Sequence, residues 1–441
     1  MMHLNATHDP QRRSWVSSAN QPGGDFPIQN LPFGVFSTEG KRRAGVAIGD
    51  RIVDLQSASE TGLLEGDAVH AVQATADGRL NGLMALGNRY AGALRSQLSE
   101  MLRTDSPKLP QARAAEGKIL VPMDSVDMCL PCDIGDYTDF LTSLHHTERH
   151  GRFKGLENPL PPAFKSLPVA YHGRASSICV SGAGVVRPNG QYKDEHGEIR
   201  FGPAPMLDFE LEMAAFVAQG NSLSGPININ QSSDYIFGYC MLNDWSAKSI
   251  QWWEQVLGPF LGKSFISSIS PWIVTQEALA PFRLPAPRRA PEDPELLAYL
   301  NGVSDQEQGG LDIELNAWIS TDAQRSAGRC ATHITQTRLE NLYWTFGQML
   351  THHASNGCNL RPGDLIGSGT ISGETDLSRA CLTELTNAGK DALDLGNGEF
   401  RTALQDGDEI IFRATAAREG AISIGFGECR GRIHPAKKWP L

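Results

Sequence analysis

The chain has 441 residues, which suits two domains, or one large and one small domain. It is 40% hydrophobic and can bury a sizeable core, while 45 glycines and 26 prolines favour turns and short strands over helical bundles. The net charge is −11 with no compensating basic run, which argues against nucleic acid or an anionic membrane as partner.

Targeting and cysteine signals are weak. No apolar run is long enough to span a membrane, and the N-terminal MMHLNATHDPQRRSW lacks the apolar core of a signal peptide, so we expect a soluble, cytoplasmic protein. The eight cysteines are scattered. Cys129 and Cys132 form a CxxC pair, which we interpret as coincidence because no second pair or flanking histidines complete a zinc site.

The N-terminal part predicts a tail followed by a small β-domain. Residues 1–25 are polar and predict a flexible tail. From Phe26, FPIQNLPFGVFS and GVAIGDRIVDL carry turn-punctuated strand signals. Apolar residues at helical spacing predict a helix over 80–102, and the polar segment 106–117 predicts a connector. We therefore expect one domain at 26–118 and a larger one at 119–441.

The larger part predicts strands separated by Gly and Pro turns. In 207–217, LDFELEMAAFV, apolar and acidic residues alternate, which predicts a strand. Helical spacing over 339–353, with Gly357 as a stop, predicts a helix. Beyond Arg361, three turn signals separate short β segments.

Three acids share one face of the strand predicted at 207–217. Asp208, Glu210 and Glu212 lie about 6.6 Å apart at alternate positions and repel one another unless a cation or several donors lie between them. Two interpretations remain open from this strand alone: a solvated acidic edge, or part of a cation site.

Two further groups of acids favour the cation site. Segment CDIGDYTDF contains Asp133, Asp136 and Asp139, with His145, His146 and His150 just after it. Asp244 follows an apolar strand, where site residues commonly stand. Oxygen ligands without a Cys/His set indicate a hard cation: Mg²⁺, Mn²⁺ or Ca²⁺.

Other chemistries have less support. His146 and His150 lie four apart, as zinc ligands on a helix do, but HExxH is absent and Gly151 weakens the prediction of a long helix. No GxSxG supports a serine hydrolase. Lys263, in LGPFLGKSF, is either on a surface turn or directed into a pocket; we favour the pocket because its neighbours look buried.

The motifs, taken in order, resemble the fumarylacetoacetase family. They are FPIQNLPFGVFS, IGDYTDF, VAYHGRASSI, LDFELEMAAFV, MLNDWSA, LGPFLGKSF, THHASNGCNLRPGDL and GSGTISG. The resemblance implies a mainly β fold with some α: a small N-terminal SH3-like β-barrel and a larger C-terminal mixed β-roll. It also implies a homodimer that binds a divalent cation and hydrolyses fumarylacetoacetate to fumarate and acetoacetate, the last step of tyrosine breakdown.

Site residues follow from the resemblance position by position. The implied metal ligands are Asp139, Glu210, Glu212 and Asp244, so Asp208 is not a ligand. The implied general base is His146, oriented by Glu384, and Gln251 and Lys263 match the groups that stabilise an oxyanion. Thr370 matches a substrate-contacting position in the Gly-rich loop.

Departures from the family pattern gather around the substrate. Leu141 and Gln255 stand where the family has tyrosines, and Lys154 and Lys248 stand where it has arginines. Lysine cannot reproduce the bidentate fork of arginine, so the grip on a substrate carboxylate changes. The alternative that these departures leave open is the same fold acting on another acylpyruvate or diketo acid, or decarboxylating a keto acid. A metal-binding protein without activity would not need His146, Glu384 and Lys263. An adaptor protein would show repeats or exposed apolar faces, and the sequence indicates neither.

Overall fold

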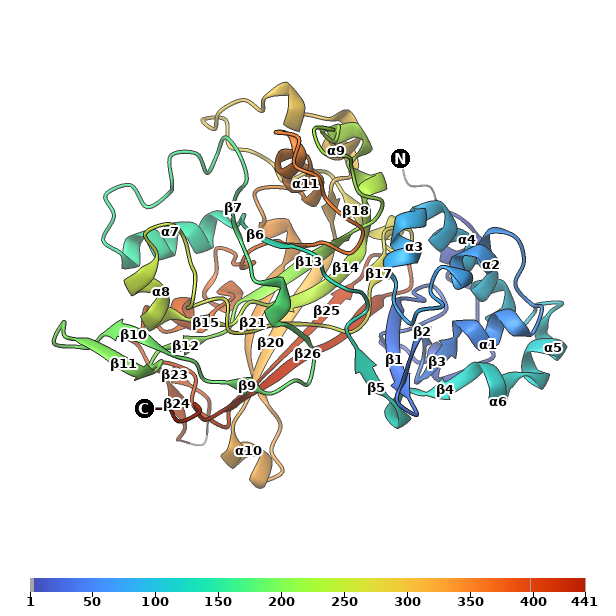
Figure 1. The fold of residues 1–441 in the computed structure, drawn as a ribbon, viewed down its shortest axis with the longest axis horizontal. Helices are drawn as coiled ribbons and strands as arrows, with labels where there is room; N and C mark the ends of the chain where they lie inside the picture. Colours follow the sequence, from blue (N-terminus) through green and yellow to red (C-terminus); the bar gives the residue numbers. More distant parts are fainter. Residues whose placement is uncertain (1–3, 397, 441) are drawn as a thin grey trace.

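The computed structural model describes residues 4–396 and 398–440. Its N-terminal part, blue to cyan in Figure 1, is an antiparallel sheet in the order β4-β3-β2-β1-β5, accompanied by short helices. The strands are β1 (Phe33–Thr38), β2 (Lys41–Ile48), β3 (Arg51–Asp54), β4 (Leu120–Pro122) and β5 (Asp127–Cys129). The helices are α1 (Leu55–Glu60), α2 (Asp67–Gln73), α3 (Asn81–Leu86), α4 (Asn88–Leu102), α5 (Leu109–Ala114) and α6 (Glu116–Ile119).

The first sheet extends past residue 118, where we expected the domain boundary. β4 pairs with β3, and β5 pairs with β1. The expected connector at 106–117 instead contains α5 and begins α6, because Ala112 and Ile119 are apolar and are fully buried against the N-terminal core. The N-terminal structural unit therefore includes the strands on both sides of this helical segment.

Residues 4–25 differ from the flexible tail that their polar composition predicted. They contain two short 3-10 turns and pack on α4, where the backbone N–H of Trp15 donates to the carbonyl oxygen of Leu102 at 3.0 Å. The fully buried guanidinium of Arg95 donates to the hydroxyl of Thr7 and to the backbone carbonyl of Gln29. A buried cation needs such partners, so this segment is fixed by a charge far away in sequence.

The larger part is built on a mixed eight-stranded sheet in the order β7-β6-β22-β13-β14-β16-β8, with β17 also paired to β14. β22 runs parallel to β6, and β16 runs parallel to β8. The strands are β6 (Tyr137–Leu141), β7 (Val169–His172), β8 (Ile178–Val180), β13 (Leu211–Val217), β14 (Ile236–Asn243), β16 (Ser267–Ile269), β17 (Val274–Thr275) and β22 (Leu365–Gly367).

A five-stranded sheet, β21-β20-β25-β26-β9, covers one face of this sheet. Its strands are β9 (Val185–Val186), β20 (Ile313–Ser320), β21 (Thr332–Arg338), β25 (Glu409–Ala416) and β26 (Ile424–His434). Two-stranded pairs complete the β structure: β10 (Asn189–Lys193) with β11 (Ile199–Pro203), β12 (Leu207–Asp208) with β15 (Ser246–Ala247), β18 (Arg283–Leu284) with β19 (Gly310–Leu311), and β23 (Leu393–Asp394) with β24 (Phe400–Arg401). The helices are α7 (Leu144–Phe153), α8 (Lys248–Glu254), α9 (Val303–Gln308), α10 (Asp322–Ser326), α11 (Phe346–Ala354) and α12 (Leu382–Leu385).

The strand predicted over 207–217 is observed as two strands, β12 and β13, with Phe209 and Glu210 between them. Met213 and Ala215 of β13 lie in the core shared with the five-stranded sheet, while Ala214 and Phe216 lie in the core shared with the N-terminal part. The strand is therefore buried on both faces. Asp208, Glu210 and Glu212 are buried too, so the solvated acidic edge is the wrong interpretation.

Two predicted helices have different limits. The helix predicted over 80–102 is divided into α3 and α4 at Gly87, whose φ of 85° lies in the left-handed region that glycine tolerates. The helix predicted over 339–353 begins only at Phe346, because Thr345 and Gln348 form a capping box there. No helix in the described part of the chain has the length and apolarity needed to cross a membrane.

Candidate active site

One cavity of about 790 Å³ brings the predicted site residues together. It is lined by Asp139, Leu141, His146, Lys154, Glu210, Glu212, Lys248, Gln251, Gln255, Lys263 and Thr370. The other two predicted residues, Asp244 and Glu384, lie directly behind this lining, in contact with Lys263 and His146. Positions spread over 246 residues of chain therefore converge on a single site.

Short elements around the eight-stranded sheet position these side chains. β6 carries Asp139, the first turn of α7 carries His146, and β13 carries Glu212. Asp244 stands between β14 and β15, and α8 begins at Lys248. Because β6, β13 and β14 belong to one sheet, acids distant in sequence meet at one place.

Three carboxylates form one compact group within the site. One oxygen from each of Asp139, Glu212 and Asp244 lies within 4.8 Å of the others, and all three residues are buried. Burial, followed by the charge of Asp244, raises the pKa of Asp139 well above its ordinary value. Burial, followed by the charges of Asp139 and Asp244, raises the pKa of Glu212 in the same way. A bound cation reverses this cost because it stabilises the ionised carboxylates.

Carboxylate oxygens without hydrogen-bond partners also indicate that this group suits a bound cation. Oδ1 of Asp139 and Oε1 of Glu212 are buried without a hydrogen-bond partner, while the other Glu212 oxygen accepts the backbone N–H of Gly369 at 3.1 Å. Gly369 has a φ of 74°, and a Cβ there would meet the Phe140 carbonyl oxygen at 2.2 Å. Buried carboxylate oxygens rarely lack partners, so these residues fit a divalent cation with oxygen ligands.

Glu210 lies between two lysines rather than in the three-carboxylate group. Nζ of Lys248 lies 2.5 Å from one of its oxygens, and Nζ of Lys263 lies 2.5 Å from the other. Although burial acts in the opposite direction, the two ammonium groups hold the pKa of Glu210 well below its ordinary value. Lys263 also contacts Asp244 at 2.6 Å, and it lines the cavity, as expected for a lysine directed into the pocket.

Asp244 has partners that sequence reasoning missed. Its carboxylate accepts hydrogen bonds from the hydroxyls of Tyr171 at 2.6 Å and Ser267 at 3.0 Å. Tyr171 lies on β7 directly opposite Asp139, and it lines the cavity. It was visible within the motif VAYHGR, but only the β6–β7 pairing shows that it faces the acids.

A histidine and a glutamate form a buried pair beside the carboxylates. Nδ1 of His146 lies 2.8 Å from Oε2 of Glu384. Ser372 donates to the same oxygen at 2.6 Å, and Arg149 donates to the other at 3.0 Å. Burial opposes ionisation, but the charge and hydrogen bond of His146, the charge of His150 and the hydrogen bond from Ser372 hold the pKa of Glu384 far below its ordinary value. An ionised Glu384 favours the tautomer of His146 that carries its proton on Nδ1, and in that tautomer Nε2 can accept a proton.

Asp208, the third acid of the alternating segment, supports this pair instead of the carboxylate group. Its oxygens accept the backbone N–H groups of Leu382 at 2.6 Å and Thr383 at 2.9 Å, which are the first two residues of α12. Asp208 therefore caps the helix that carries Glu384.

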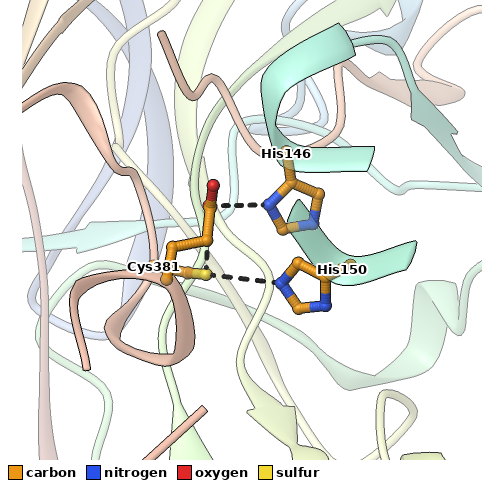
Figure 2. Close-up of side chains that lie close together, drawn as sticks. His146, His150 and Cys381 are labelled. Carbon is orange, nitrogen blue, oxygen red and sulfur yellow. Dashed lines mark hydrogen bonds and ion pairs between the residues drawn. The ribbon is translucent and has the colours of Figure 1, made fainter. Parts of the chain in front are cut away.

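His150 and Cys381 lie next to the pair. Figure 2 shows the rings of His146 and His150 side by side on α7, with the sulfur of Cys381 facing His150. The ring centroids are 4.2 Å apart, and Sγ of Cys381 lies 3.8 Å from Nε2 of His150. Burial, followed by the charge of His146, holds the pKa of His150 well below its ordinary value. Both histidines belong to a helix, which the sequence analysis had doubted.

The remaining predicted residues complete the wall of the cavity. Oε1 of Gln251 and Oγ1 of Thr370 are buried without partners and are available to a ligand. Lys154 is exposed at the rim, whereas Leu141 and Gln255 are half-buried. Asp133 and Asp136 do not join the site, since they pair with Arg79 and Arg361 outside it. Cys129 and Cys132 are both free thiols.

Carboxylates, two lysines and a histidine–glutamate pair surround one cavity, an arrangement that suits the site of a hydrolase. Residues 29–131 match the model of the fumarylacetoacetase N-terminal domain, and residues 137–434 match that of the fumarylacetoacetate hydrolase C-terminal domain. The chain therefore belongs to the fumarylacetoacetase family of hydrolases.

Full-length relatives agree with this assignment. The chain is 45% identical to a fumarylacetoacetase of Oryza sativa subsp. japonica over 96% of this chain and 97% of the relative. It is 43% identical to a Homo sapiens fumarylacetoacetase over 93% of this chain and 97% of the relative. A solved structure of Cg1458 with inhibitor shares the fold alone, at 12% identity and a TM-score of 0.50, covering 92% of this chain and all of that one.

Proposed function

We propose that the protein hydrolyses fumarylacetoacetate to fumarate and acetoacetate, cleaving a carbon–carbon bond in a β-diketo acid. The observation that carries this proposal is the convergence of the three-carboxylate group and the His146–Glu384 pair on one cavity. The full-length relatives named fumarylacetoacetase favour this substrate over another diketo acid or a decarboxylation.

Asp139, Glu212 and Asp244 would hold the divalent cation, with Glu210 beside them. Their oxygens select a hard ion, so Mg²⁺ or Ca²⁺ is the proposed cofactor and Mn²⁺ also suits them. When bound, the cation polarises a carbonyl of the substrate and stabilises negative charge on its oxygens. Tyr171 and Ser267 orient Asp244 by donating to its carboxylate.

His146 is the proposed general base. Its Nε2 takes one proton from a water molecule while the water oxygen attacks the carbonyl carbon. Glu384 fixes the tautomer and stabilises the imidazolium, and Arg149 and Ser372 hold Glu384 in place. When the carbon–carbon bond breaks, the bonding pair stays on the departing carbon, which takes the proton back from His146. Atoms and protons therefore balance within one turnover.

Lys263 and Gln251 would stabilise the oxyanion formed by that attack. Both line the cavity, and Lys263 is held near the carboxylates by Glu210 and Asp244. A preorganised ammonium in a buried site stabilises developing negative charge more strongly than water does. Thr370 offers its unpartnered hydroxyl to the substrate, and Lys154 at the rim offers a positive charge to a carboxylate.

A panel of diketo acids tests the proposal. Fumarylacetoacetate and shorter acylpyruvates are assayed with EDTA and with Mg²⁺, Ca²⁺ or Mn²⁺ added back. We expect fumarate release from fumarylacetoacetate, its loss in EDTA and its recovery on adding the cation. Turnover that persists in EDTA, or that is confined to another diketo acid, would overturn the assignment.

Further features expected from the resemblance are part of the same proposal. They are a homodimer, a cytoplasmic location, a place at the end of tyrosine breakdown and an SH3-like closure of the N-terminal sheet. Sedimentation of the full chain tests the first of these: a species of twice the 47.9 kDa chain mass is expected.

A further inference from the structure

A second group of metal-binding side chains lies beside the three-carboxylate group. One ligand atom from each of His146, His150, Cys381 and Glu384 lies within 4.8 Å of the others. We propose that these four side chains form a site for a thiophilic divalent cation such as Zn²⁺, and that filling this site switches off the base His146. We name it the nitrogen–sulfur site, to distinguish it from the carboxylate site of Asp139, Glu212 and Asp244.

Two elements bring the four ligands together. α7 presents His146 and His150 one turn apart, so their rings face the same side. Cys381 immediately precedes α12, and Glu384 lies in that helix, which Asp208 anchors. Zinc had little support from the sequence at the two histidines, since HExxH is absent and Gly151 weakened the prediction of a long helix. α12 and the residue before it supply two further ligands from more than 230 residues away.

The separations suit a tetrahedral ion. Nδ1 of His146 lies 2.8 Å from Oε2 of Glu384, which lies 3.3 Å from Sγ of Cys381, which in turn lies 3.8 Å from Nε2 of His150. Bonds of about 2.0–2.3 Å to zinc place tetrahedral ligands roughly 3.3–3.8 Å apart, so small side-chain movements suffice. Figure 2 shows the two imidazoles on one side of α7, with the sulfur of Cys381 next to His150.

Ligand chemistry distinguishes the two sites. The nitrogen–sulfur site offers two imidazoles, a thiol and one carboxylate, a set that Zn²⁺, Cd²⁺ and Co²⁺ bind and that Mg²⁺ or Ca²⁺ does not. The carboxylate site offers oxygen alone. An ion reaches the nitrogen–sulfur site through the cavity, because His146 and His150 both line it while Cys381 and Glu384 lie behind them.

Inhibition follows from the proton balance at His146 and rests on its proposed role as base. The entering cation takes the place of the proton between Nδ1 and Glu384, and Cys381 releases its thiol proton to solvent. The displaced Nδ1 proton passes through solvent to Nε2 of His146. The ring stays neutral, but the atom proposed to accept a proton from water is already protonated, so turnover stops.

The test uses the full chain with Mg²⁺ in excess to saturate the carboxylate site. Co²⁺ or Cd²⁺ is titrated in, and the ultraviolet thiolate-to-metal absorption is recorded beside turnover. We expect the band to saturate at one equivalent and turnover to fall in parallel. Cys381→Ser should abolish the band, and His150→Gln should weaken binding about 10-fold or more. Cys330→Ser removes an exposed thiol and is the matched control, which should keep the band.

Each result decides the proposal. A band that survives Cys381→Ser, disappears in Cys330→Ser or fails to form at one equivalent overturns the site. If Cys381→Ser lowers the melting temperature so far that it does not fold, His150→Gln carries the test. A saturating band with unchanged turnover leaves the nitrogen–sulfur site standing but overturns its inhibitory role, and with it His146 as the base, so the two failures are distinguishable.

Discussion

Nδ1 of His146 and Oε2 of Glu384 are 2.8 Å apart although 238 residues separate them in the chain. Three residues support this contact. The Ser143 hydroxyl accepts the backbone N–H of His146 at the start of α7, and Arg149 donates to Glu384. Asp208 accepts the backbone N–H of Leu382 at the start of α12. Ser143 and Arg149 belong to α7 and its N-cap, whereas Asp208 belongs to β12, so the pair depends on two segments that are far apart in the chain.

His146→Ala should lower kcat by about 10²-fold or more, because a positioned general base contributes on that order. Cation binding, measured by calorimetry with Mg²⁺, should persist, since His146 is not among the three grouped carboxylates. His145→Ala is the matched control: the neighbouring histidine is half-buried and is not among the residues that line the cavity. An inactive His145 variant beside an active His146 variant would show that the base is misassigned.

Within segment 207–217, we expect Glu212 to bind the cation and Asp208 to stabilise α12. Glu212→Gln should weaken Mg²⁺ binding by about 100-fold or more, since even second-shell changes cost about 10–100-fold. Asp208→Asn should leave Mg²⁺ affinity unchanged but lower the melting temperature, because an amide cannot accept both α12 N–H groups as a carboxylate does. Equal losses of affinity in the two variants would contradict this separation.

The features best predicted from the sequence are those that depend on neighbouring residues or on short motifs. The strand predicted over 207–217 is confirmed for Leu211–Val217, while 207–208 form the separate β12, and the family motifs predicted residues that line one cavity. The family prediction is confirmed by the matched domain models and the full-length relatives. The assigned roles of individual residues remain predictions.

Long-range contacts explain what the sequence could not predict. Residues 4–25 are polar, and only the buried Arg95 and the end of α4 show why they are ordered. Glu210 and Glu212 stand at alternate positions of the same segment, yet Glu210 is paired with two lysines, Lys248 of α8 and Lys263 of the following loop. Local periodicity carries no information on either partner, so both outcomes required the tertiary structure.

Lys248→Met should destabilise the protein by about 3–5 kcal/mol, because it leaves the buried Glu210 carboxylate without one of its two counter-charges. Urea unfolding with and without Mg²⁺ measures the change. Arg152→Met is the control: it breaks an exposed pair with Glu148 on α7, and pairs of that kind contribute about 0.3–0.5 kcal/mol. Equal effects of the two variants would mean that Glu210 gains nothing from Lys248.

Asp305 should make stability depend on pH. Burial raises its pKa to about 6 from 3.8, although Thr345 donates to it at 2.7 Å. A raised pKa means that folding favours the protonated acid, so this stabilisation is complete below pH 3.8 and is lost as pH rises through about 6. The difference corresponds to about 3 kcal/mol at most.

Asp305→Asn removes that titration and should raise the free energy of unfolding at pH 8 while changing little at pH 4. Unfolding by urea at both pH values measures this, with Asp376→Asn on the surface as control. A variant less stable than the wild type at pH 8 would show that the ionised form is stabilised there after all.

Leu141→Tyr tests how the cavity grips its substrate. Leu141 lies at the end of β6 on the cavity wall, half-buried, two residues after Asp139 and therefore on the same face of the strand. A phenol there would add a donor for a substrate carboxylate or carbonyl, worth about 1–3 kcal/mol when the bond is charge-assisted. Gln255, at the end of α8, already supplies an amide nearby, and Lys154 supplies a movable charge at the rim.

We expect the wild type to accept diketo acids with less polar tails, and Leu141→Tyr to raise kcat/KM for fumarylacetoacetate about 5-fold or more relative to those analogues. The comparison is made as a ratio of kcat/KM values for each enzyme, so that a general change in activity cancels. Leu141→Phe is the matched control, since it adds the ring without the hydroxyl. If the Phe and Tyr variants shift the ratio equally, ring size and not hydrogen bonding sets the preference. If neither variant shifts it, the departure at this position is neutral, and the unpartnered hydroxyl of Thr370 on the cavity wall is the next donor to examine.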